Sequence, residues 1–376
     1  MTNGHVLIAP DKFKGTLSAL EVATHLEAGL HAAQPGLRTV TVSVADGGDG
    51  TVDAAVAAGF ARITVPVTGP TGQLIKAAIA VRGPSAVIEV AVASGLASLP
   101  GGRPDPLGAT SRGTGELVGA ALDRGCTEVV LGVGGSACTD GGAGMLQALG
   151  ARLRDATGDE LAPGGAALAT LDHVDLDGLD QRLRQVRIVL ASDVDNPLLG
   201  PRGAARVYAP QKGASPADVA VLESALRRWA AALGPDAARL PGAGAAGGIG
   251  YAALTVLAAQ RRPGIDVLLG LVGFADKLAG ARLVVTGEGS LDEQTLHGKA
   301  PAGVAAVARS AGVPVVAVCG RQLLTDEALA DAGILSAYAL TGIEPDVGRC
   351  MAEPGPLLQR LAATIAGDWL LDNVDG

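Results

Sequence analysis

The feature that most constrains this chain is a repeated order: a short apolar run, a loop rich in glycine and carboxylates, then a helical pattern. The run Leu-Val-Val at residues 283–285 suits a strand covered on both faces, and we expect it to end at Gly287-Glu288-Gly289, where glycine permits a sharp turn. The same order begins at residue 5, where Ser18 and Glu21 are spaced as a capping box before a helical pattern. An apolar run followed by an acidic loop also occurs at residues 188–197. Alternating strands and helices predict an α/β protein whose polar loops lie at the carboxyl ends of its strands.

Residues 63–92 break this order with consecutive strand-like runs separated by Gly-Pro turns. This pattern predicts an antiparallel meander and marks a second domain inserted into the first. A chain of 376 residues also exceeds the size at which one core keeps growing. We therefore expect one α/β domain from residues 1–62 and 281–376, and an inserted α/β domain with a mixed sheet from residues 63–280.

The composition excludes several classes of protein. No apolar run reaches the ~18 to 20 residues of a membrane span, and the amino terminus shows no basic segment followed by an apolar one, so a cytoplasmic protein is expected. The net charge of −9, without a cluster of Lys and Arg, argues against nucleic acid as a partner. The four cysteines are scattered without CxxC pairs, which argues against disulfides or a structural zinc site.

Charged side chains follow the first two predicted strands. Residues 5–9 are followed by Lys12 and Lys14, and a second strand over residues 38–44 is followed by a glycine loop with Asp46 and Asp49. If these strands are parallel, their carboxyl ends meet at one edge of the sheet. The sequence therefore predicts that both loops contribute to one site.

The stretch after residues 283–285 places Glu288, Asp292 and Lys299 within one loop and the start of a helix. Two carboxylates and an ammonium can converge there on a small anionic or metal-bound ligand. The alternative is a solvated loop in which Asp292 only caps a turn.

Two further strand ends carry candidate chemistry. The segment from Gly134 to Gly142 leads into a predicted helix, and free backbone N–H groups at such a place form an anion cradle. After residues 188–191, Asp193 and Asp195 are two apart on extended backbone and point to the same side, which suits a metal or a general base. The alternative is an Asx-Pro turn that only ends the strand.

Common catalytic motifs are missing or weak. Gly298-Lys299 lacks the rest of a Walker P-loop, and the chain has no GxSxG or HExxH motif. GxGxxG-like strings begin at Gly132 and Gly242, but neither has the surroundings of a dinucleotide site. Acidic residues for Mg²⁺, lysines for phosphate oxygens and glycine loops for phosphates are the parts that phosphoryl transfer needs.

The sequence resembles the bacterial glycerate kinase family over nearly its whole length. The matching stretches occur in family order: APDKFKGTLSALEVA, ADGGDGT, TSRGTGELVGAAL, GGSACTDGGAGMLQALGA, SDVDNPLLG, PQKGAS, PGAGAAGGIG and VVTGEGSLDEQTLHGKAPAGVA. The resemblance implies a flavodoxin-like domain made from both chain ends, with a second α/β domain inserted. It also implies phosphorylation of D-glycerate by ATP and Mg²⁺, with 2-phosphoglycerate as the usual product.

With this resemblance, the candidate residues take roles in a kinase. Asp193 would activate the glycerate hydroxyl or hold the metal, Lys14 would bind the substrate carboxylate, and Lys299 would neutralise the transferring phosphoryl group. Position 195 varies in the family, which favours Asp193 over Asp195. The remaining candidates are metal ligands (Glu288, Asp292), substrate-binding residues (Asp46, Asp49, Asn196) and phosphate-binding residues (Gly134, Gly135, Ser136, Thr139, Gly287, Gly289).

Two other functions remain open at this point. A nicotinamide-dependent oxidoreductase of a small hydroxy acid would require a strand directly before the Gly242 tract. A non-catalytic sensor of a sugar acid or a nucleotide would bind without turnover. The sequence also leaves open a homodimer.

Overall fold

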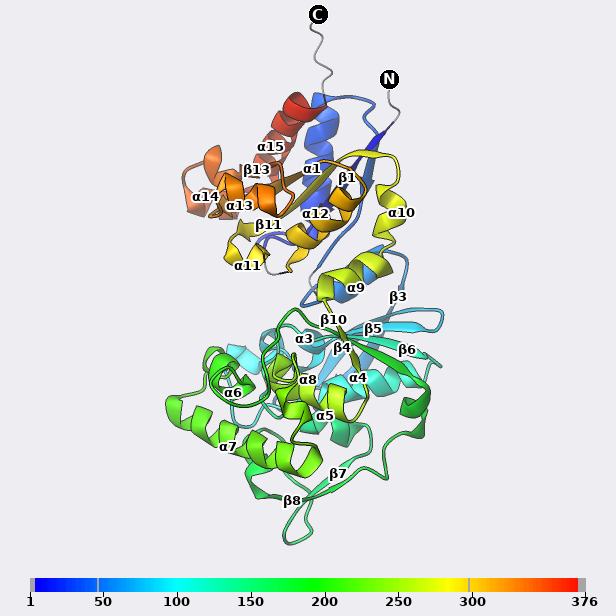
Figure 1. The fold of residues 1–376 in the computed structure, drawn as a ribbon, viewed down its shortest axis with the longest axis vertical. Coiled ribbons are helices and arrows are strands. Elements are labelled where there is room, and N and C mark those ends of the chain that lie inside the picture. Colours follow the sequence, from blue (N-terminus) through cyan, green and yellow to red (C-terminus); the bar gives the residue numbers. More distant parts are fainter. Residues whose placement is uncertain (1–3, 46, 297, 371–376) are drawn as a thin grey trace, which may run out of the picture. The chain divides into compact units, whose positions relative to one another are not determined.

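The computed structural model describes residues 4–45, 47–296 and 298–370. These residues form two compact units, one from the described residues up to 45 and from 265 onward, the other from residues 47–264 (Figure 1). The borders predicted from the sequence, after residues 62 and 280, lie further along the chain than these. Helix α2 (Thr51–Ala57) contacts strands of the second unit and belongs there. The carbonyl of Lys277 in α10 (Phe274–Leu278) is hydrogen-bonded to His5, so α10 belongs to the first unit.

The first unit contains a five-stranded sheet in the order β13-β12-β11-β1-β2, and all its strand pairs are parallel. Its strands are β1 (His5–Pro10), β2 (Thr39–Thr41), β11 (Ala281–Leu291), β12 (Val315–Gln322) and β13 (Ser336–Ala339). Counted along the chain, this is the strand order 2-1-3-4-5 of flavodoxin-like folds. The flavodoxin-like domain made from both chain ends is confirmed.

Strand β11 is longer than predicted, and it runs through Gly287, Glu288 and Gly289 instead of turning there. The reason is contact between strands. A Cβ on Gly287 would lie 2.2 Å from the carbonyl oxygen of Val318, and a Cβ on Gly320 would lie 2.6 Å from that of Gly289. These glycines therefore permit close approach of β11 and β12, and the expectation of a turn was wrong.

Helices cover both faces of this sheet. Helix α1 (Ala19–Ala33) begins at Ser18, whose capping box with Glu21 confirms the predicted start. Helix α15 (Pro354–Trp369) packs along α1, and both bury leucines against the sheet (Figure 1). Helix α12 (Ala300–Ser310) contacts β1, β11 and β12. The remaining helices are α9 (Gly264–Leu271), α10, α11 (Glu293–Leu296), α13 (Asp326–Asp331) and α14 (Val347–Ala352).

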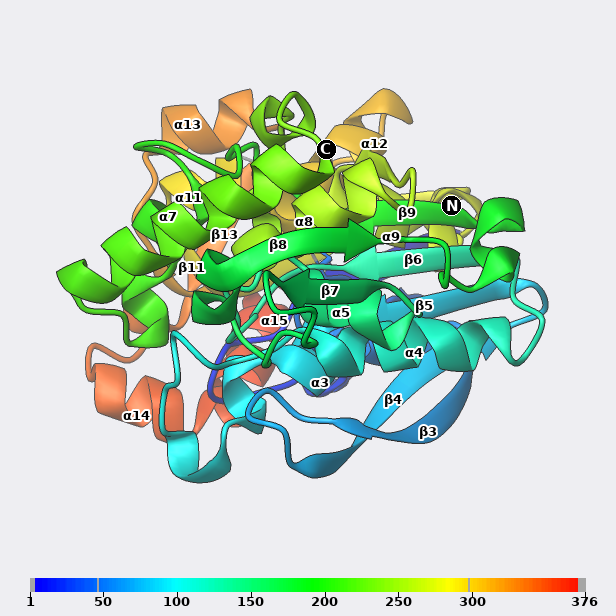
Figure 2. The same cartoon turned by 90° about the horizontal axis from the view of Figure 1, so that it is seen from below.

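The second unit contains a six-stranded mixed sheet in the order β10-β9-β6-β5-β4-β3. Its strands are β3 (Ala61–Thr68), β4 (Leu74–Arg82), β5 (Ser85–Glu89), β6 (Glu128–Gly132), β9 (Arg187–Ala191) and β10 (Gln260–Arg262). Strands β3, β4 and β5 form the predicted antiparallel meander, and the pairs from β5 to β10 are parallel (Figure 2). The run expected to continue as a strand ends at Glu89, where helix α3 (Val90–Ser94) begins.

The core of this unit is built from Ala, Val, Leu and Ile with one buried tryptophan, Trp229. Helix α4 (Arg112–Leu122) contacts β3, β4 and β5, and it lies beside α5 (Ala143–Ala148) (Figure 2). The other helices are α2, α6 (Ala204–Tyr208), α7 (Pro216–Leu233) and α8 (Ala245–Thr255). A separate hairpin consists of β7 (Arg152–Asp155) and β8 (Leu171–Asp175). Among the described residues, no helix is both long and apolar enough to cross a membrane.

Candidate active site

In the first unit, the candidate residues gather where the strand order reverses, between β1 and β11. Open α/β sheets bind ligands at the carboxyl ends of the strands at such a point. The N–H of Asp11, directly after β1, donates to the carbonyl oxygen of Gly287, 2.8 Å away. A Cβ on Gly289 would lie 3.5 Å from the backbone nitrogen of Lys14. The loop that carries Lys14 therefore lies beside the end of β11.

An ammonium links the two predicted metal ligands of this unit. Lys299 Nζ lies 3.6 Å from Glu288 Oε2 and 3.7 Å from Asp292 Oδ1. Lys299 is the residue directly before α12, and Asp292 accepts a hydrogen bond from the N–H of Gln294. The three side chains therefore lie close together, as the sequence predicted. Asp292 also turns the backbone before α11, so the turn and the cluster coexist.

Glu288 is the buried member of this cluster. Its side chain accepts a hydrogen bond from the hydroxyl of Thr295, which is itself buried. Burial raises the pKa of Glu288, whereas the Thr295 hydrogen bond and the Lys299 charge act in the opposite direction. Glu288 thus combines a desolvated carboxylate with a cation, a pattern that is common at functional sites.

The other predicted residues of this unit have different surroundings. Lys14 is exposed, so its ammonium is available to an anion in solution. Gly287 is buried within β11, where its backbone belongs to the sheet, while Gly289 is only half-buried.

In the second unit, a glycine turn at residues 47–50 crosses the end of β6. A Cβ on Gly132 would lie 2.4 Å from the carbonyl oxygen of Gly47, and a Cβ on Gly134 would lie 2.6 Å from the Cα of Gly48. Only residues without a side chain allow this approach. Asp49 is exposed on this turn, and Asp46 lies outside the described residues. The sequence predicted this turn at the edge of the first sheet, but it packs on the second sheet.

The predicted phosphate cradle follows β6 directly. Gly135 has a φ of 70° and is exposed, and Gly134 is half-buried, so ligand can reach the backbone of this turn. The side chain of Ser136 is buried, and that of Thr139 is completely so, with a hydroxyl that lacks a hydrogen-bond partner among the described residues. The backbone, more than these hydroxyls, is therefore suited to hold a phosphate.

A buried lysine supports this turn from inside the protein. Lys212 Nζ donates to Ser136 Oγ at 2.8 Å and to the carbonyl oxygen of Cys138, and the side chain is 2% exposed. Burial lowers the pKa of Lys212. Lys212 was not among the predicted site residues, although it stands in the matched stretch PQKGAS.

The start of two helices is fixed by Asp140, another buried residue that sequence analysis did not select. Its carboxylate accepts from the N–H and the hydroxyl of Ser111, both at 2.8 Å, and from the N–H groups of Gly142 and Gly144. Asp140 therefore anchors Ser111, the N-cap residue of α4, and the first turn of α5.

After β9, the two neighbouring aspartates differ. Asp193 is half-buried, and its Oδ1 accepts from the N–H of Gly264 at 2.8 Å. Asp195 is exposed and pairs with Arg202 at 2.9 Å. Asn196 holds its own loop, because its side chain donates to the carbonyl of Arg202 and accepts from the hydroxyl of Tyr208. The two aspartates therefore differ in burial and in their partners, while the choice of Asp193 as the site residue stays a prediction.

A buried glutamate at the end of β5 was also missed by the sequence analysis. Glu89 is 2% exposed, and its carboxylate accepts a hydrogen bond from the N–H of Val52. Burial raises the pKa of Glu89 to about 7; the backbone groups of Val52 and Gly50 oppose the shift, and the Asp49 charge adds to it. Its position inside an apolar run gave no local signal of this role.

The glycine tract that begins at Gly242 contains none of the predicted site residues. The Gly242 tract follows a 3-10 turn (Ala237–Arg239), so the strand required by a nicotinamide site is not there. A Cβ on Gly247 would lie 2.1 Å from the carbonyl oxygen of Cys138, which shows that this tract serves close packing.

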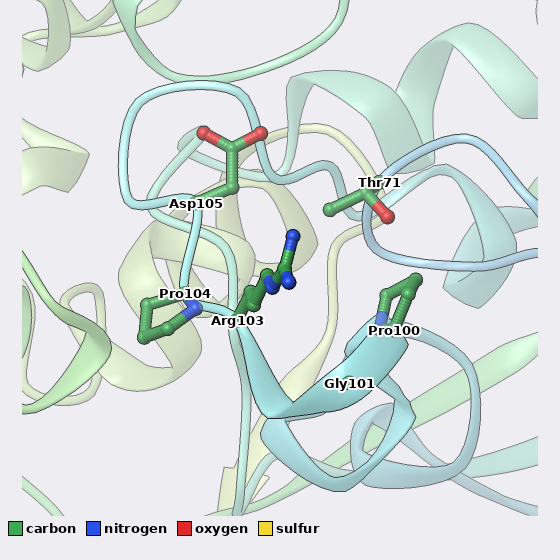
Figure 3. A pocket seen from close by; sticks show the side chains of 6 residues that line it. All are labelled: Thr71, Pro100, Gly101, Arg103, Pro104 and Asp105. Carbon is green, nitrogen blue, oxygen red and sulfur yellow. The ribbon is translucent and has the colours of Figure 1, made fainter.

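An open hollow of about 550 Å³ is lined by Thr71, Pro100, Gly101, Arg103, Pro104 and Asp105, with the Arg103 side chain directed into it (Figure 3).

The candidate residues provide part of what a site for Mg²⁺ and phosphates requires. Over the described ranges, no group of three or more His, Cys, Asp or Glu side chains could hold a metal by itself. Mg²⁺ usually keeps several waters and takes one or two carboxylates plus substrate phosphates. Glu288 and Asp292, which share one ammonium, meet that smaller requirement.

Comparison with known proteins gives one consistent result. Residues 6–370 match the model of the glycerate kinase family. Glycerate kinase of Bacillus subtilis is 45% identical over 368 residues, covering 96% of each chain. Glycerate 2-kinase of Escherichia coli is 45% identical over 345 residues, covering 90% of this chain and 89% of the relative.

A solved structure agrees with these relatives. The crystal structure assigned to glycerate kinase 2 of Salmonella typhimurium LT2 superposes with a TM-score of 0.82 at 43% identity, covering 98% of this chain and all of the other.

Proposed function

The chain belongs to the glycerate kinase family, and on that premise we propose that it transfers the γ-phosphoryl group of ATP, bound with Mg²⁺, to D-glycerate. The observation that carries this proposal is the cluster at the strand switch point, where Lys299 Nζ lies within 3.7 Å of carboxylate oxygens of both Glu288 and Asp292. Phosphoryl transfer depends on positioning and charge stabilisation, and this cluster supplies both signs of charge.

In the first unit, Glu288 and Asp292 would hold the magnesium ion, and Lys299 would lie against the phosphoryl oxygens. When bound, Mg²⁺ would offset the charge of the phosphates. Because Thr295 and Lys299 already fix the Glu288 carboxylate, this ligand needs little reorganisation. Lys14, exposed beside the end of β11, would pair with the carboxylate of glycerate.

In the second unit, Asp193 would accept the proton of the glycerate hydroxyl as that oxygen bonds to phosphorus and ADP leaves. The N–H of Gly264 holds the Asp193 carboxylate in position through Oδ1, and an ionised carboxylate is a group that can take this proton. The backbone of Gly134 and Gly135 would hold nucleotide phosphates, and Asp49 would contact substrate hydroxyls. The main role of Asn196 would be to shape the loop after β9.

We further propose that the acceptor is the hydroxyl on carbon 2 of glycerate. Support comes from the Escherichia coli relative, which is named glycerate 2-kinase and matches 90% of this chain. The position of the phosphate in the product tests this choice directly.

Release of ADP tests the proposed function. The purified protein is incubated with ATP, Mg²⁺ and D-glycerate, with L-glycerate as a control for stereochemistry and EDTA as a control for the metal. We expect ADP release that needs D-glycerate and Mg²⁺. Absence of ADP release, together with a change in absorbance when glycerate and NAD are added, would support the oxidoreductase. Binding of ATP or glycerate without turnover would support the sensor.

A further inference from the structure

A single buried carboxylate holds the start of α2 and the glycine turn before it. Helix α2 follows Gly50, whose φ of 101° is left-handed and which has no side chain to cap the helix. Glu89 at the end of β5 accepts from the N–H of Val52 in the first turn of α2 instead, and the backbone of Gly50 lies close enough to lower its pKa. It therefore supplies, from a distant part of the chain, the acceptor that an N-cap side chain normally provides.

The turn held in this way reaches the predicted phosphate cradle. Thr51 Oγ1 donates to the carbonyl oxygen of Gly48 at 2.7 Å, which closes the turn on itself. Gly48 lies so close to Gly134 that a Cβ there would be 2.6 Å from its Cα. A shift at the start of α2 would therefore move both Asp49 and the surface that meets Gly134.

The charges around Glu89 increase the demand on its hydrogen bonds. Asp49 and Asp53 both act on its carboxylate as like charges, and Asp53 is itself paired with Arg62. A buried carboxylate among like charges remains ionised only when donors stabilise it. The N–H of Val52 in the first turn of α2 is such a donor, so the carboxylate holds the start of the helix that follows the turn.

We propose that Glu89 is a positioning residue for substrate binding, which fixes the turn at residues 47–50 so that Asp49 is presented beside the Gly134 backbone. This inference rests on the proposed function, since the substrate assigned to Asp49 is D-glycerate. Glu89 does not touch substrate, because its side chain is buried.

Glu89→Gln tests the inference with little change in shape. Glutamine keeps the shape but removes the charge, and it replaces one acceptor oxygen with an NH₂ group, which cannot accept from a backbone N–H. We expect the KM for D-glycerate to rise about tenfold while kcat changes less than about twofold, because the loss is in positioning. Hydrogen exchange of a peptide covering residues 47–57 should become faster, whereas that of peptides from β6 should not.

Glu116→Gln is the matched control. The Glu116 carboxylate also accepts from a distant segment, the N–H and the hydroxyl of Thr68, but it lies on α4, away from the glycine turn. This variant should reduce the melting temperature and leave the KM for D-glycerate unchanged. If Glu89→Gln behaves in the same way, Glu89 is only structural and the inference is overturned.

Failure of the inference can be told apart from failure of the proposed function. If the wild type phosphorylates D-glycerate and Glu89→Gln leaves both KM and exchange unchanged, the inference alone is wrong. If the wild type shows no such activity, the proposed function is wrong. Exchange at residues 47–57 then still reports whether Glu89 holds the turn, and the claim about substrate falls with the function.

Discussion

The ammonium of Lys212 lies 2.8 Å from the hydroxyl oxygen of Ser136, inside the second unit and directly behind the exposed turn at Gly135. A buried cation is costly unless its surroundings use the charge. Here its field acts on the backbone that would hold phosphates, and its hydrogen bonds to Ser136 and Cys138 set the shape of that backbone.

Lys212→Met should therefore weaken nucleotide binding. Methionine is of similar length, so the cavity remains filled, but the charge is lost and Ser136 and Cys138 lose their donor. We expect the KM for ATP to rise about tenfold, or ~1.4 kcal/mol, with a smaller effect on the KM for D-glycerate. Lys76→Met, at an exposed position of β4, is the control. Equal KM values for ATP in Lys212→Met and wild type would contradict this role.

The same lysine should leave a mark on the pH dependence of stability. Because burial lowers its pKa in the folded state, the unfolded chain binds more protons between that lowered pKa and the ordinary lysine pKa of about 10.4. The contribution of Lys212 to the free energy of unfolding should therefore increase as the pH rises toward about 10.4. Urea unfolding of the wild type and of Lys212→Met at pH 7 to 10 measures this. The difference in stability between them should change with pH in that direction, and a constant difference would argue against it.

Asp193→Asn should abolish most of the turnover and retain the fold. Asparagine can still accept from the N–H of Gly264 through its carbonyl oxygen, but it cannot take a proton. We expect kcat to fall by about 10² to 10⁴ with little change in melting temperature. Asp195→Asn, which removes only an exposed pair with Arg202, should be close to wild type. Similar kcat values for the two variants would remove Asp193 from the reaction.

The raised pKa of Glu288 predicts how Mg²⁺ binding depends on pH. A metal ligand must be ionised, and burial raises the pKa of Glu288 above the ordinary range of a carboxylate. The apparent affinity for Mg²⁺ should therefore fall at a higher pH than an exposed carboxylate would require. In Lys299→Met the affinity for Mg²⁺ should fall at a still higher pH, because Lys299 favours the ionised form of Glu288 in the wild type. An acid limb at the same pH in both proteins would contradict the coupling.

Gly134→Ala tests the contact between the two glycine turns. Its Cβ would lie 2.6 Å from the Cα of Gly48, so the turn at residues 47–50 must move. We expect a rise of at least about tenfold in KM for D-glycerate or ATP. Gly119→Ala on α4 meets nothing within 4 Å and should stabilise the protein by about 0.5–1 kcal/mol. Wild-type KM values in Gly134→Ala would show that the turns move independently.

Local patterns predicted the features that local physics determines. Ser18 and Glu21 form their capping box within four residues of chain, and the meander over residues 63–92 follows from strand patterns and turns. Glu288, Asp292 and Lys299 were found because they fall within one short stretch.

Contacts between distant residues determined the features that the sequence did not predict. Glu89 looked like part of a strand, and its function depends on Val52, 37 residues away. Lys212 looked like a loop residue, and its burial depends on Ser136, 76 residues away. Gly287 suggested a turn by the ordinary rule for glycine, but contact with Val318 keeps it in a strand. Each case requires the fold before the role of the residue is visible.

The position of the phosphate in the product tests the central claim most directly. The protein is incubated with ATP, Mg²⁺ and D-glycerate, and the product is examined by proton-coupled ³¹P NMR. Phosphate on carbon 2 couples to one proton and gives a doublet, whereas phosphate on carbon 3 couples to two and gives a triplet. We predict the doublet of 2-phosphoglycerate, formed only when Mg²⁺ is present. A triplet would contradict the choice of hydroxyl, and no phosphoglycerate signal would contradict the kinase itself.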